Sequence, residues 1–274
     1  LADIVARVGK RFEKEGIAVP RALGVFERAA DIQESVGPDS PVMLKALVLI
    51  GGRGKAGGVR RAADQAEAVS LAAEILGRKI RGYPVERLLV EEAVEAVGGA
   101  CYIGVTMNPA DFNVTVIVSP AGGVDIEQVA RESPDKILRV ELPNNDEVLP
   151  EAATARLAAF LASGLGGGTA QIDALKAVIS KVYAVFQKYD CKVAEINPLL
   201  LTAAGPVAAD AKIVLDDNGL YRQEGLFHLL GLATARHDVS EPTRNEIRAR
   251  EAGFRYVDLL AEELHYWMPM RRNI

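Results

Sequence analysis

The spacing of apolar residues along the chain changes between two periods, which predicts a mixed α/β protein. Residues 41–50 and 88–91 are short, almost continuous apolar runs, as expected of buried strands. Residues 62–76 and 172–189 instead repeat their apolar positions every three or four residues, as one face of a helix does. The other expected elements are helices over residues 2–15, 27–36 and 157–162 and strands over residues 17–20, 101–107 and 113–119.

The two longest predicted helices also indicate which side faces the core. In each of them the apolar residues form a stripe along one face. These residues are Ala66, Val69, Ala73 and Leu76 in the first helix and Ile172, Leu175, Val178, Ile179, Val182 and Phe186 in the second. Stripes of this kind are typical of core packing.

Composition narrows the class of protein. The chain has 274 residues, of which 49% are hydrophobic and 25% charged, as in an ordinary globular protein with one large domain or two lobes. Its net charge of −5 argues against a nucleic-acid partner. No apolar run approaches the roughly 18 residues of a membrane span and no signal peptide is recognised, so we expect no membrane partner. Cys101 and Cys191 lack metal-binding spacing, which indicates reduced thiols and a cytoplasmic location.

A predicted hairpin carries the most informative polar residues. Two short strands, residues 192–196 and 207–215, flank a turn with the sequence Ala-Ala-Gly-Pro. Glu195 and Asn197 are two residues apart and therefore lie on one face of the first strand and its end. Asp210 lies on the returning strand, so pairing of the two strands would bring it opposite them.

The chemistry of this hairpin has two interpretations. Two carboxylates and an amide make an all-oxygen site suited to Mg²⁺, which also takes phosphate oxygens as ligands. Alternatively, the hairpin is simply buried and its acids pair with Lys212 or Arg222. The strand pattern alone leaves both interpretations open.

A glycine-rich loop follows the apolar run at residues 41–50. The run contains one lysine, Lys45, which is costly to bury unless it meets an anion. Residues 51–58 combine five glycines with Arg53 and Lys55, so backbone N–H groups and positive charge can both approach a phosphate. The alternative is a flexible surface loop with a solvated lysine nearby. Cations and glycines together, straight after a strand, favour phosphate binding.

The same loop also satisfies the GxGxxG pattern of dinucleotide-binding folds, through Gly52, Gly54 and Gly57. In those folds the helix starts within the motif, so that its N-terminus meets the pyrophosphate. Here the clear helix begins only near residue 62, and two cations crowd the loop. A dinucleotide-dependent oxidoreductase is therefore disfavoured.

Three stretches together resemble the beta subunit of succinate–CoA ligase and its relatives. They are EINPL at 195–199, Asp-x-Lys at 210–212 followed by DDNGLYR at 216–222, and VMLKALVLIGGRGKAGGV at 42–59. The resemblance covers nearly the whole chain. It implies an α/β ATP-grasp fold, in which two lobes hold Mg-nucleotide between them.

The resemblance also implies a division of the chain. An ATP-grasp domain would cover residues 1–240, and residues 241–274 would form a C-terminal junction and tail, without the family's usual C-terminal CoA-ligase domain. Within the ATP-grasp domain, a smaller lobe at about 21–98 would be inserted into a second lobe made of residues 1–20 and 99–240.

Roles for individual residues follow from the resemblance as well. Those that would act on the ATP phosphates or line the nucleotide are Lys45, Gly52, Arg53, Gly54, Glu91 and the position of Val94. Those that would hold Mg²⁺ are Asn197 and Asp210, with Glu195 close by. Without the resemblance, Glu91 is equally compatible with a strand-end salt bridge. Pro20 falls where the family selects its nucleotide base, and proline there is similar to ATP-using members.

Some positions depart from the family pattern. Val94 replaces a polar residue, and Ala100 replaces an acid that in the family accepts hydrogen bonds from ribose hydroxyls. Glu92 or Glu95 is available as a substitute for that acid. Ala121 replaces another acid in the loop after residue 119, so we expect that loop to be structural.

The implied function is that of the nucleotide-binding, beta-type subunit of an acid–CoA ligase. Such an enzyme converts ATP, a carboxylate and CoA into ADP, phosphate and acyl-CoA. The phosphohistidine and the CoA site would come from an alpha-type partner subunit, since none of His228, His237 and His265 has a glycine-flanked setting. The chain is therefore expected to be inactive alone. The competing interpretation is a regulatory or assembly subunit with an ATP-grasp fold and a weakened nucleotide site.

The expected tail contains the only tryptophan of the chain, Trp267, which is followed by Met268 and Met270 and then by two arginines. Aromatic residues, Met and Arg are enriched at protein interfaces, so residues 264–272 are expected to meet the partner. The alternative is that the tail folds back on its own domain.

Overall fold

The computed structural model describes residues 12–48, 52–80, 82–108, 111–143, 147–216, 254–258 and 265–269, together with residues 219, 222, 223, 225 and 248. The chain forms two compact units, Leu1–Ala235 and Arg236–Ile274. In the second unit, β13 (Phe254–Asp258) and β14 (His265–Pro269) pair as antiparallel strands. Most of the predicted helix at residues 2–15 lies outside the described residues.

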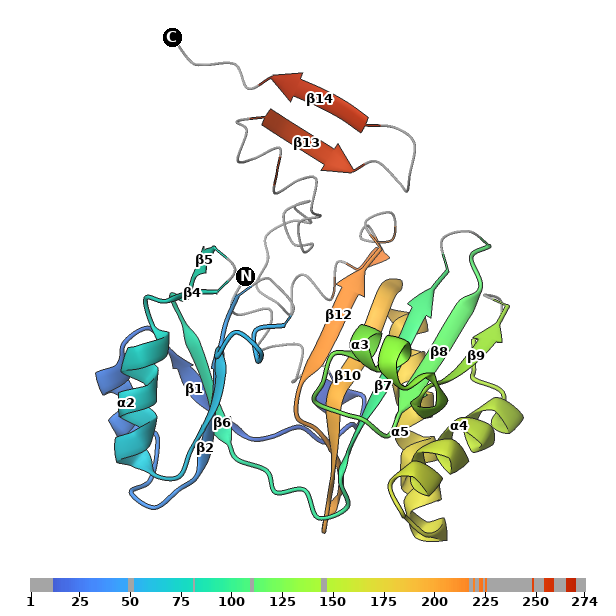
Figure 1. The fold of residues 1–274 in the computed structure, drawn as a ribbon, viewed down its shortest axis with the longest axis horizontal. Helices are drawn as coiled ribbons and strands as arrows, with labels where there is room; N and C mark the ends of the chain where they lie inside the picture. Colours follow the sequence, from blue (N-terminus) through green and yellow to red (C-terminus); the bar gives the residue numbers. More distant parts are fainter. Residues whose placement is uncertain are drawn as a thin grey trace. The chain divides into compact units, whose positions relative to one another are not determined.

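The first unit contains a four-stranded antiparallel sheet, which is blue and teal in Figure 1. Its strands are β1 (Ala22–Phe26), β2 (Val42–Ala46), β3 (Val59–Ala62) and β6 (Leu88–Glu92), in the order β1-β6-β2-β3. A 3₁₀ helix (Ala29–Glu34), helix α2 (Gln65–Ile75) and a small hairpin of β4 (Lys79–Ile80) and β5 (Tyr83–Pro84) complete this part. We call residues 22–92 the small lobe; they share one hydrophobic core.

A second, six-stranded sheet follows. Its strands are β7 (Ala100–Met107), β8 (Val114–Ser119), β9 (Leu138–Leu142), β10 (Cys191–Thr202), β11 (Gly205–Ala208) and β12 (Ala211–Leu215). The order is β11-β10-β7-β8-β9, and β12 also pairs with β10. We call residues 12–19 and 100–216 the large lobe, because Phe12 and Ile17 belong to its core and Ala18 bridges to Val207 of β11.

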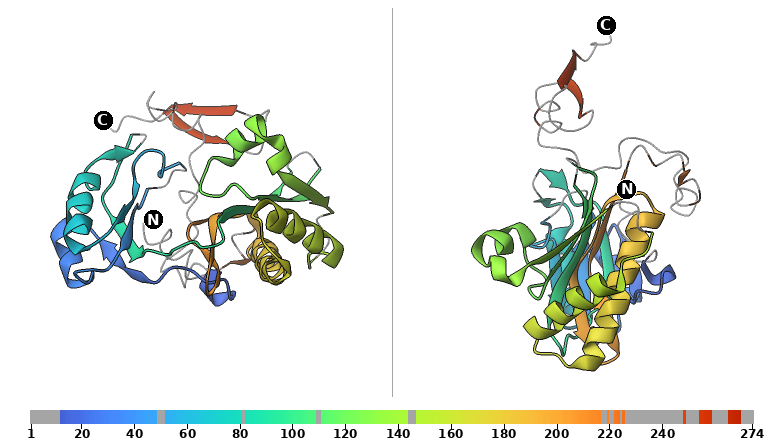
Figure 2. Two further views of the ribbon diagram at one scale, coloured as in Figure 1. Left: turned by 60° about the horizontal axis from the view of Figure 1, so that its bottom comes forward. Right: turned by 90° about the vertical axis from the view of Figure 1, so that its right-hand side faces the viewer.

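Three helices accompany the second sheet. Helices α4 (Glu151–Gly164) and α5 (Thr169–Lys188) lie together on one face. Helix α3 (Ile126–Glu132), followed by a 3₁₀ turn (Pro134–Lys136), lies on the opposite side in the right-hand view of Figure 2. One face of the sheet is therefore covered by the helical core, and the other is left for polar residues.

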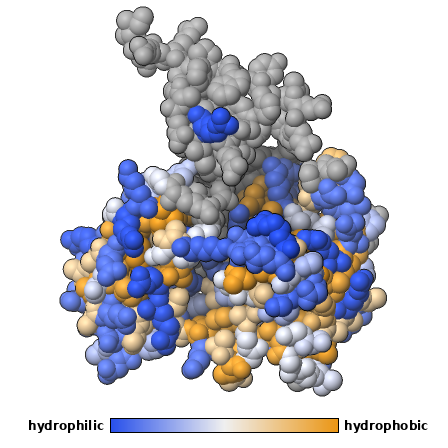
Figure 3. All heavy atoms as spheres, viewed as in Figure 1, coloured by the Kyte–Doolittle hydropathy of each residue, from blue (hydrophilic) through white to orange (hydrophobic). Residues whose placement is uncertain are grey.

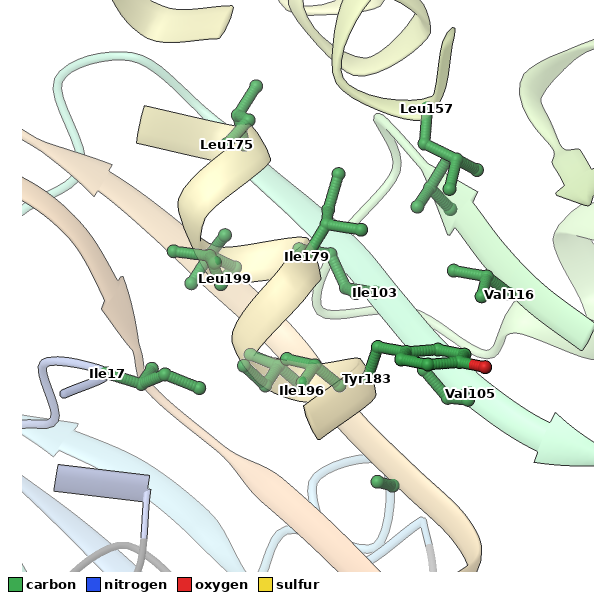
Figure 4. Close-up of a cluster of buried hydrophobic side chains, with 14 of the residues drawn as sticks. Ile17, Ile103, Val105, Val116, Leu157, Leu175, Ile179, Tyr183, Ile196 and Leu199 are labelled. Carbon is green, nitrogen blue, oxygen red and sulfur yellow. The ribbon is translucent and has the colours of Figure 1, made fainter. Parts of the chain in front are cut away.

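The core of the large lobe follows from strand alternation. Ile103 and Val105 of β7 and Ile196 of β10 are completely buried, and Figure 4 shows them beside Ile179 and Tyr183 of α5. Successive strand residues point to opposite faces, so the residues between these ones turn toward the α3 side. The same strands thus build both the core and the polar face.

The α/β class predicted from the sequence is confirmed, since the first unit combines two sheets with helices. Five of the six predicted stripe residues of α5 are buried, and Ile172 is partly buried against the core. The face predicted for the helix at 62–76 was wrong in part, because Val69 and Leu76 pack against the core but Ala66 and Ala73 are exposed. The buried residues of α2 are Ala68, Leu71, Ala72 and Ile75.

The reason for that error is where the helix begins. Residues 59–62 complete strand β3, which pairs with β2, and α2 starts only after Asp64, whose side chain accepts a hydrogen bond from the Glu67 N–H. Alanines spread around this helix made its apolar face ambiguous. The helix predicted at 27–36 is also shorter than expected, a 3₁₀ helix of six residues.

Both cysteines are buried and free of disulfide bonds. Burial raises the pKa of each thiol to about 12, so both stay protonated at neutral pH. Within the described part of the chain, no helix is both long and apolar enough to cross a membrane.

We predict that Ile179→Ala lowers the free energy of unfolding by about 2–5 kcal/mol, because it removes fully buried methyl groups from the α5 stripe. Val148→Ala is the control, since Val148 is 76% exposed and its truncation should change stability by less than about 0.5 kcal/mol. Urea unfolding of both variants measures this. Equal stability of the two would show that α5 does not anchor the core.

Candidate functional site

Two buried cations of the small lobe mark the candidate site. Lys45 of β2 is 5% exposed, and its Nζ donates hydrogen bonds to the Glu91 carboxylate and to the carbonyl oxygen of Ala209. In the sheet Lys45 lies opposite Leu89 and Met43 opposite Glu91. Lys45 and Glu91 are therefore diagonal neighbours on one face, within reach of long side chains.

Arg53 is the second cation and is 8% exposed. One terminal nitrogen donates to the carbonyl oxygen of Ala46 at 2.9 Å, and the other donates to Asp210 Oδ1 at 2.9 Å. The first contact ties the glycine loop to the end of β2. The second reaches from the small lobe to the large lobe, as does the contact of Lys45 with Ala209.

The glycine loop itself joins two antiparallel strands, β2 and β3. Gly52 and Gly57 have positive φ values of 73° and 76°, which favour glycine, and Gly54 has no heavy atom within 4 Å of where a Cβ would be. The loop is closed by the hydrogen bond from the Gly58 N–H to the Arg53 carbonyl at 2.8 Å. A dinucleotide fingerprint joins a strand to a helix instead, so the GxGxxG match is accidental.

The predicted hairpin is present but differs in detail. Strand β10 continues to Thr202, and the returning strand is split into β11 and β12 with Asp210 in the bend between them. The Asn197 N–H donates to the Asp210 carbonyl at 2.9 Å, so the two residues do lie opposite each other. Lys212 lies opposite Glu195 in the strand register.

The side chain of Asn197 connects the sheet to the loop after β8. Its Oδ1 accepts a hydrogen bond from the Gly123 N–H at 2.7 Å, and its Nδ2 donates to the Val124 carbonyl at 2.9 Å. Gly123 has a positive φ of 75°. This loop was expected to be structural, and its backbone holds the side chain of Asn197, one of the predicted Mg²⁺ ligands.

Glu195 lies on the same strand, two residues before Asn197. The Tyr102 hydroxyl of β7 donates to Glu195 Oε2 at 3.0 Å. Burial raises the pKa of the Tyr102 hydroxyl well above its usual range, and the Glu195 carboxylate adds to this effect. Tyr102 was not a candidate from the sequence.

Helix α3 brings further polar groups toward the glycine loop. Lys55 donates to Asp125 Oδ2 and to Gln128 Oε1, both at 3.2 Å. Interaction with the Glu127 carboxyl holds the pKa of Asp125 well below its usual range, and the neighbouring Asp125 carboxyl raises the pKa of Glu127. Figure 3 shows hydrophilic residues gathered where α3 lies in Figure 1.

The structure also places the remaining residues that were named in the sequence analysis. Val94 is half-buried in the connector between β6 and β7. Glu92 is paired with Arg21 through two hydrogen bonds, and Glu95 is exposed. Arg222 pairs with Asp190, and this pairing lowers the pKa of Asp190.

The residues predicted to bind Mg²⁺ have a suitable donor set. Among the described residues, no three carboxylate, histidine or cysteine side chains are grouped to hold a metal. Asn197 and Asp210, however, are joined by a backbone hydrogen bond and supply an amide oxygen and a carboxylate, the hard oxygen donors that Mg²⁺ prefers. In this arrangement Arg53 neutralises the Asp210 carboxylate.

We predict that Lys45→Met lowers the free energy of unfolding by about 3–5 kcal/mol, because Glu91 would be left buried without its partner. Adding Glu91→Leu should restore stability to within about 1 kcal/mol, since an apolar pair of similar volume replaces the ion pair. Chemical denaturation measures both variants.

The neighbouring Arg21–Glu92 pair provides the control. Its side chains are 72% and 48% exposed, so Arg21→Met should lower stability far less than Lys45→Met. Equal losses for Lys45→Met and Arg21→Met would contradict a dependence on burial.

Comparisons with known proteins place the chain in a family. A sequence profile of the ATP-grasp domain matches residues 8–201. The succinate–CoA ligase [ADP-forming] subunit beta of Bacteroides fragilis is 41% identical over 225 residues, which are 81% of this chain and 55% of that protein. The chain spans 55% to 63% of the length of such curated relatives.

Solved structures show the same fold at low sequence identity. Acetyl-coenzyme A synthetase 1 of Ca. Korarchaeum cryptofilum, with 18% identity, has a TM-score of 0.57 over 76% of this chain and 90% of its own. ATP citrate lyase of Methanothrix soehngenii, with 17% identity, has a TM-score of 0.56 over 94% of this chain and 61% of its own. The chain belongs to the ATP-grasp family, and its sequence is similar to the beta subunits of succinate–CoA ligases.

Proposed function

We propose that the chain binds Mg-ATP and is the nucleotide-handling, beta-type part of an acid–CoA ligase. The observation that carries the proposal is the meeting of Lys45 and Arg53 with Ala209 and Asp210 beside the glycine loop. Two nearly buried cations beside a glycine-rich loop suit a polyphosphate. Phosphoryl transfer needs positioning and charge stabilisation more than a protein nucleophile, so this site is sufficient for the protein's part of the step.

Lys45 and Arg53 keep donors available for phosphate oxygens. An ammonium has three N–H donors. Among the described residues, Lys45 uses two of them, one toward Glu91 and one toward Ala209. Arg53 has five N–H donors and uses two terminal nitrogens toward Ala46 and Asp210. Glu91 orients the Lys45 ammonium, and the Ala46 carbonyl orients the Arg53 guanidinium, so both cations are held in place before the phosphates arrive.

Asn197 and Asp210 would hold the metal, with Glu195 close by. A bound Mg²⁺ neutralises phosphate charge and orients the phosphate oxygens. The chain's own part is to supply the amide and carboxylate oxygens from paired strands, where the hydrogen bond between Asn197 and Asp210 fixes their backbone separation.

The wider reaction is proposed from the relatives. The relatives are named succinate–CoA ligase [ADP-forming] subunit beta, which fits a reaction of ATP, a carboxylate and CoA that gives ADP, phosphate and acyl-CoA. In this proposal an alpha-type partner subunit supplies the phosphohistidine and the CoA site, and the protein acts in the cytoplasm.

One observation favours a second candidate, an ATP-grasp-fold regulatory or assembly subunit. Val94 and Ala100 lack the polar groups expected for the nucleotide, and the possible substitute Glu92 is already paired with Arg21. Calorimetry with ATP, ADP and NAD, each with and without Mg²⁺, separates the candidates. Mg-dependent ATP binding supports the ligase role, whereas absence of nucleotide binding supports the regulatory one and preference for NAD contradicts both.

We predict that Asp210→Asn weakens binding of Mg-ATP at least about tenfold while changing the binding of metal-free ATP by less than about threefold. The reason is that the substitution removes a negative charge from the proposed Mg²⁺ site. It leaves Lys45, which would contact the phosphates, in place. Calorimetry in Mg²⁺ and in EDTA gives both affinities. Equal losses would show that Asp210 serves only to hold Arg53.

We also predict that the purified chain forms no acyl-CoA from ATP, CoA and a carboxylate such as succinate. Formation should appear when a candidate alpha-type subunit is added, because that subunit would bring the phosphohistidine. A coupled assay of ADP release measures both conditions. Robust turnover by the chain without a partner would refute this part of the proposal.

A further inference from the structure

Tyr102 and Glu195 form a hydrogen bond that the proposed roles do not use. The hydroxyl donates to Glu195 Oε2 at 3.0 Å, and the tyrosine is only 5% exposed. The two residues come from neighbouring strands, β7 and β10, on the face of the sheet that also carries Asn197. A buried tyrosine therefore contacts a predicted site residue directly.

The absence of a side chain at Gly104 leaves room for this contact. Glu195 lies opposite Gly104 in the strand register, and Tyr102 precedes Gly104 by two residues on the same face. A Cβ on Gly104 would lie 2.2 Å from the Tyr102 hydroxyl oxygen and 2.7 Å from the ring carbon that bears it. The ring therefore crosses over Gly104 to reach Glu195.

The backbone gives no other reason for glycine at this position. Gly104 is not among the residues with positive φ, and it lies inside a strand, where glycine is less favourable than alanine by about 0.5–1 kcal/mol. Glycine within a strand often marks a place where another group approaches closely. Here that group is the phenol of Tyr102.

We propose that Tyr102 is a positioning residue, whose hydroxyl, passing over Gly104, holds the Glu195 carboxylate in the orientation it uses in the cation site. This assignment rests on the proposed function, because Glu195 would act beside the cation held by Asn197 and Asp210. A carboxylate with one oxygen fixed by a buried phenol loses rotational freedom before the cation binds, so less of the binding free energy is spent on ordering it.

The test measures Mn²⁺ binding in the presence of ATP by electron paramagnetic resonance, for the wild type, Tyr102→Phe, Glu195→Ala and the double variant. Tyr102→Phe should weaken Mn²⁺ binding by about 3- to 10-fold, which corresponds to the net contribution of one ordinary hydrogen bond. It should leave the affinity for metal-free ATP unchanged. In the Glu195→Ala background the same change should have no further effect, because the carboxylate it positions is gone.

Tyr189→Phe is the matched control. The Tyr189 hydroxyl also donates to a glutamate, Glu15 Oε1 at 2.6 Å, and Tyr189 is 3% exposed. Its loss should therefore lower stability without changing Mn²⁺ affinity. If Tyr102→Phe does not fold, Gly104→Ala gives the same test, since the added methyl group displaces the hydroxyl.

Two results would overturn the assignment in different ways. Wild-type Mn²⁺ affinity retained in Tyr102→Phe, or an equal loss with and without Glu195, would refute the positioning role and leave the proposed function intact. A wild-type chain that binds ATP equally with and without Mn²⁺ would refute the proposed function, and the assignment with it.

Discussion

The first unit of the structure depends on how two buried cations are neutralised. Lys45 and Arg53 are each more than nine-tenths buried, and an unpaired charge at such a depth would cost several kcal/mol. Glu91 supplies an anion from within the small lobe, but the Ala209 carbonyl and the Asp210 carboxylate come from the large lobe. The bend between β11 and β12 thus supplies the counter-charge of Arg53 and a second acceptor for Lys45.

Strand β10 makes that arrangement possible because its two faces have different partners. Ala194 and Ile196 are completely buried in the core that includes α5. Glu195 and Asn197 alternate with them and meet Tyr102 and the loop at Gly123 instead. A shift of one residue in the register would exchange the two sets, so burial of the apolar face also fixes the position of the polar one.

The sequence predicted those features that depend on local pattern. The stripe of α5, the strands at 101–107 and 113–119 and the pairing of Asn197 with Asp210 follow from period and turn chemistry. Helix α3 and strand β9 were not predicted, because α3 has no buried residue and β9 has no fully buried one to set a period. Strand β10 was expected to end at residue 196, since proline at 198 normally interrupts a strand. The Arg53–Asp210 contact joins residues 157 positions apart, and only strand order and lobe contact bring them together.

These ion pairs also bear on how a nucleotide would bind. Each cation expected to meet a phosphate already has an anionic partner, Glu91 for Lys45 and Asp210 for Arg53. A phosphate that draws the Arg53 guanidinium away would leave the Asp210 carboxylate without its counter-charge. That loss is offset when a divalent cation arrives together with the phosphate, since Asp210 then gains a stronger partner than the one it gives up. Nucleotide and metal would therefore favour each other's binding through a single carboxylate, a coupling that is reciprocal by thermodynamic necessity.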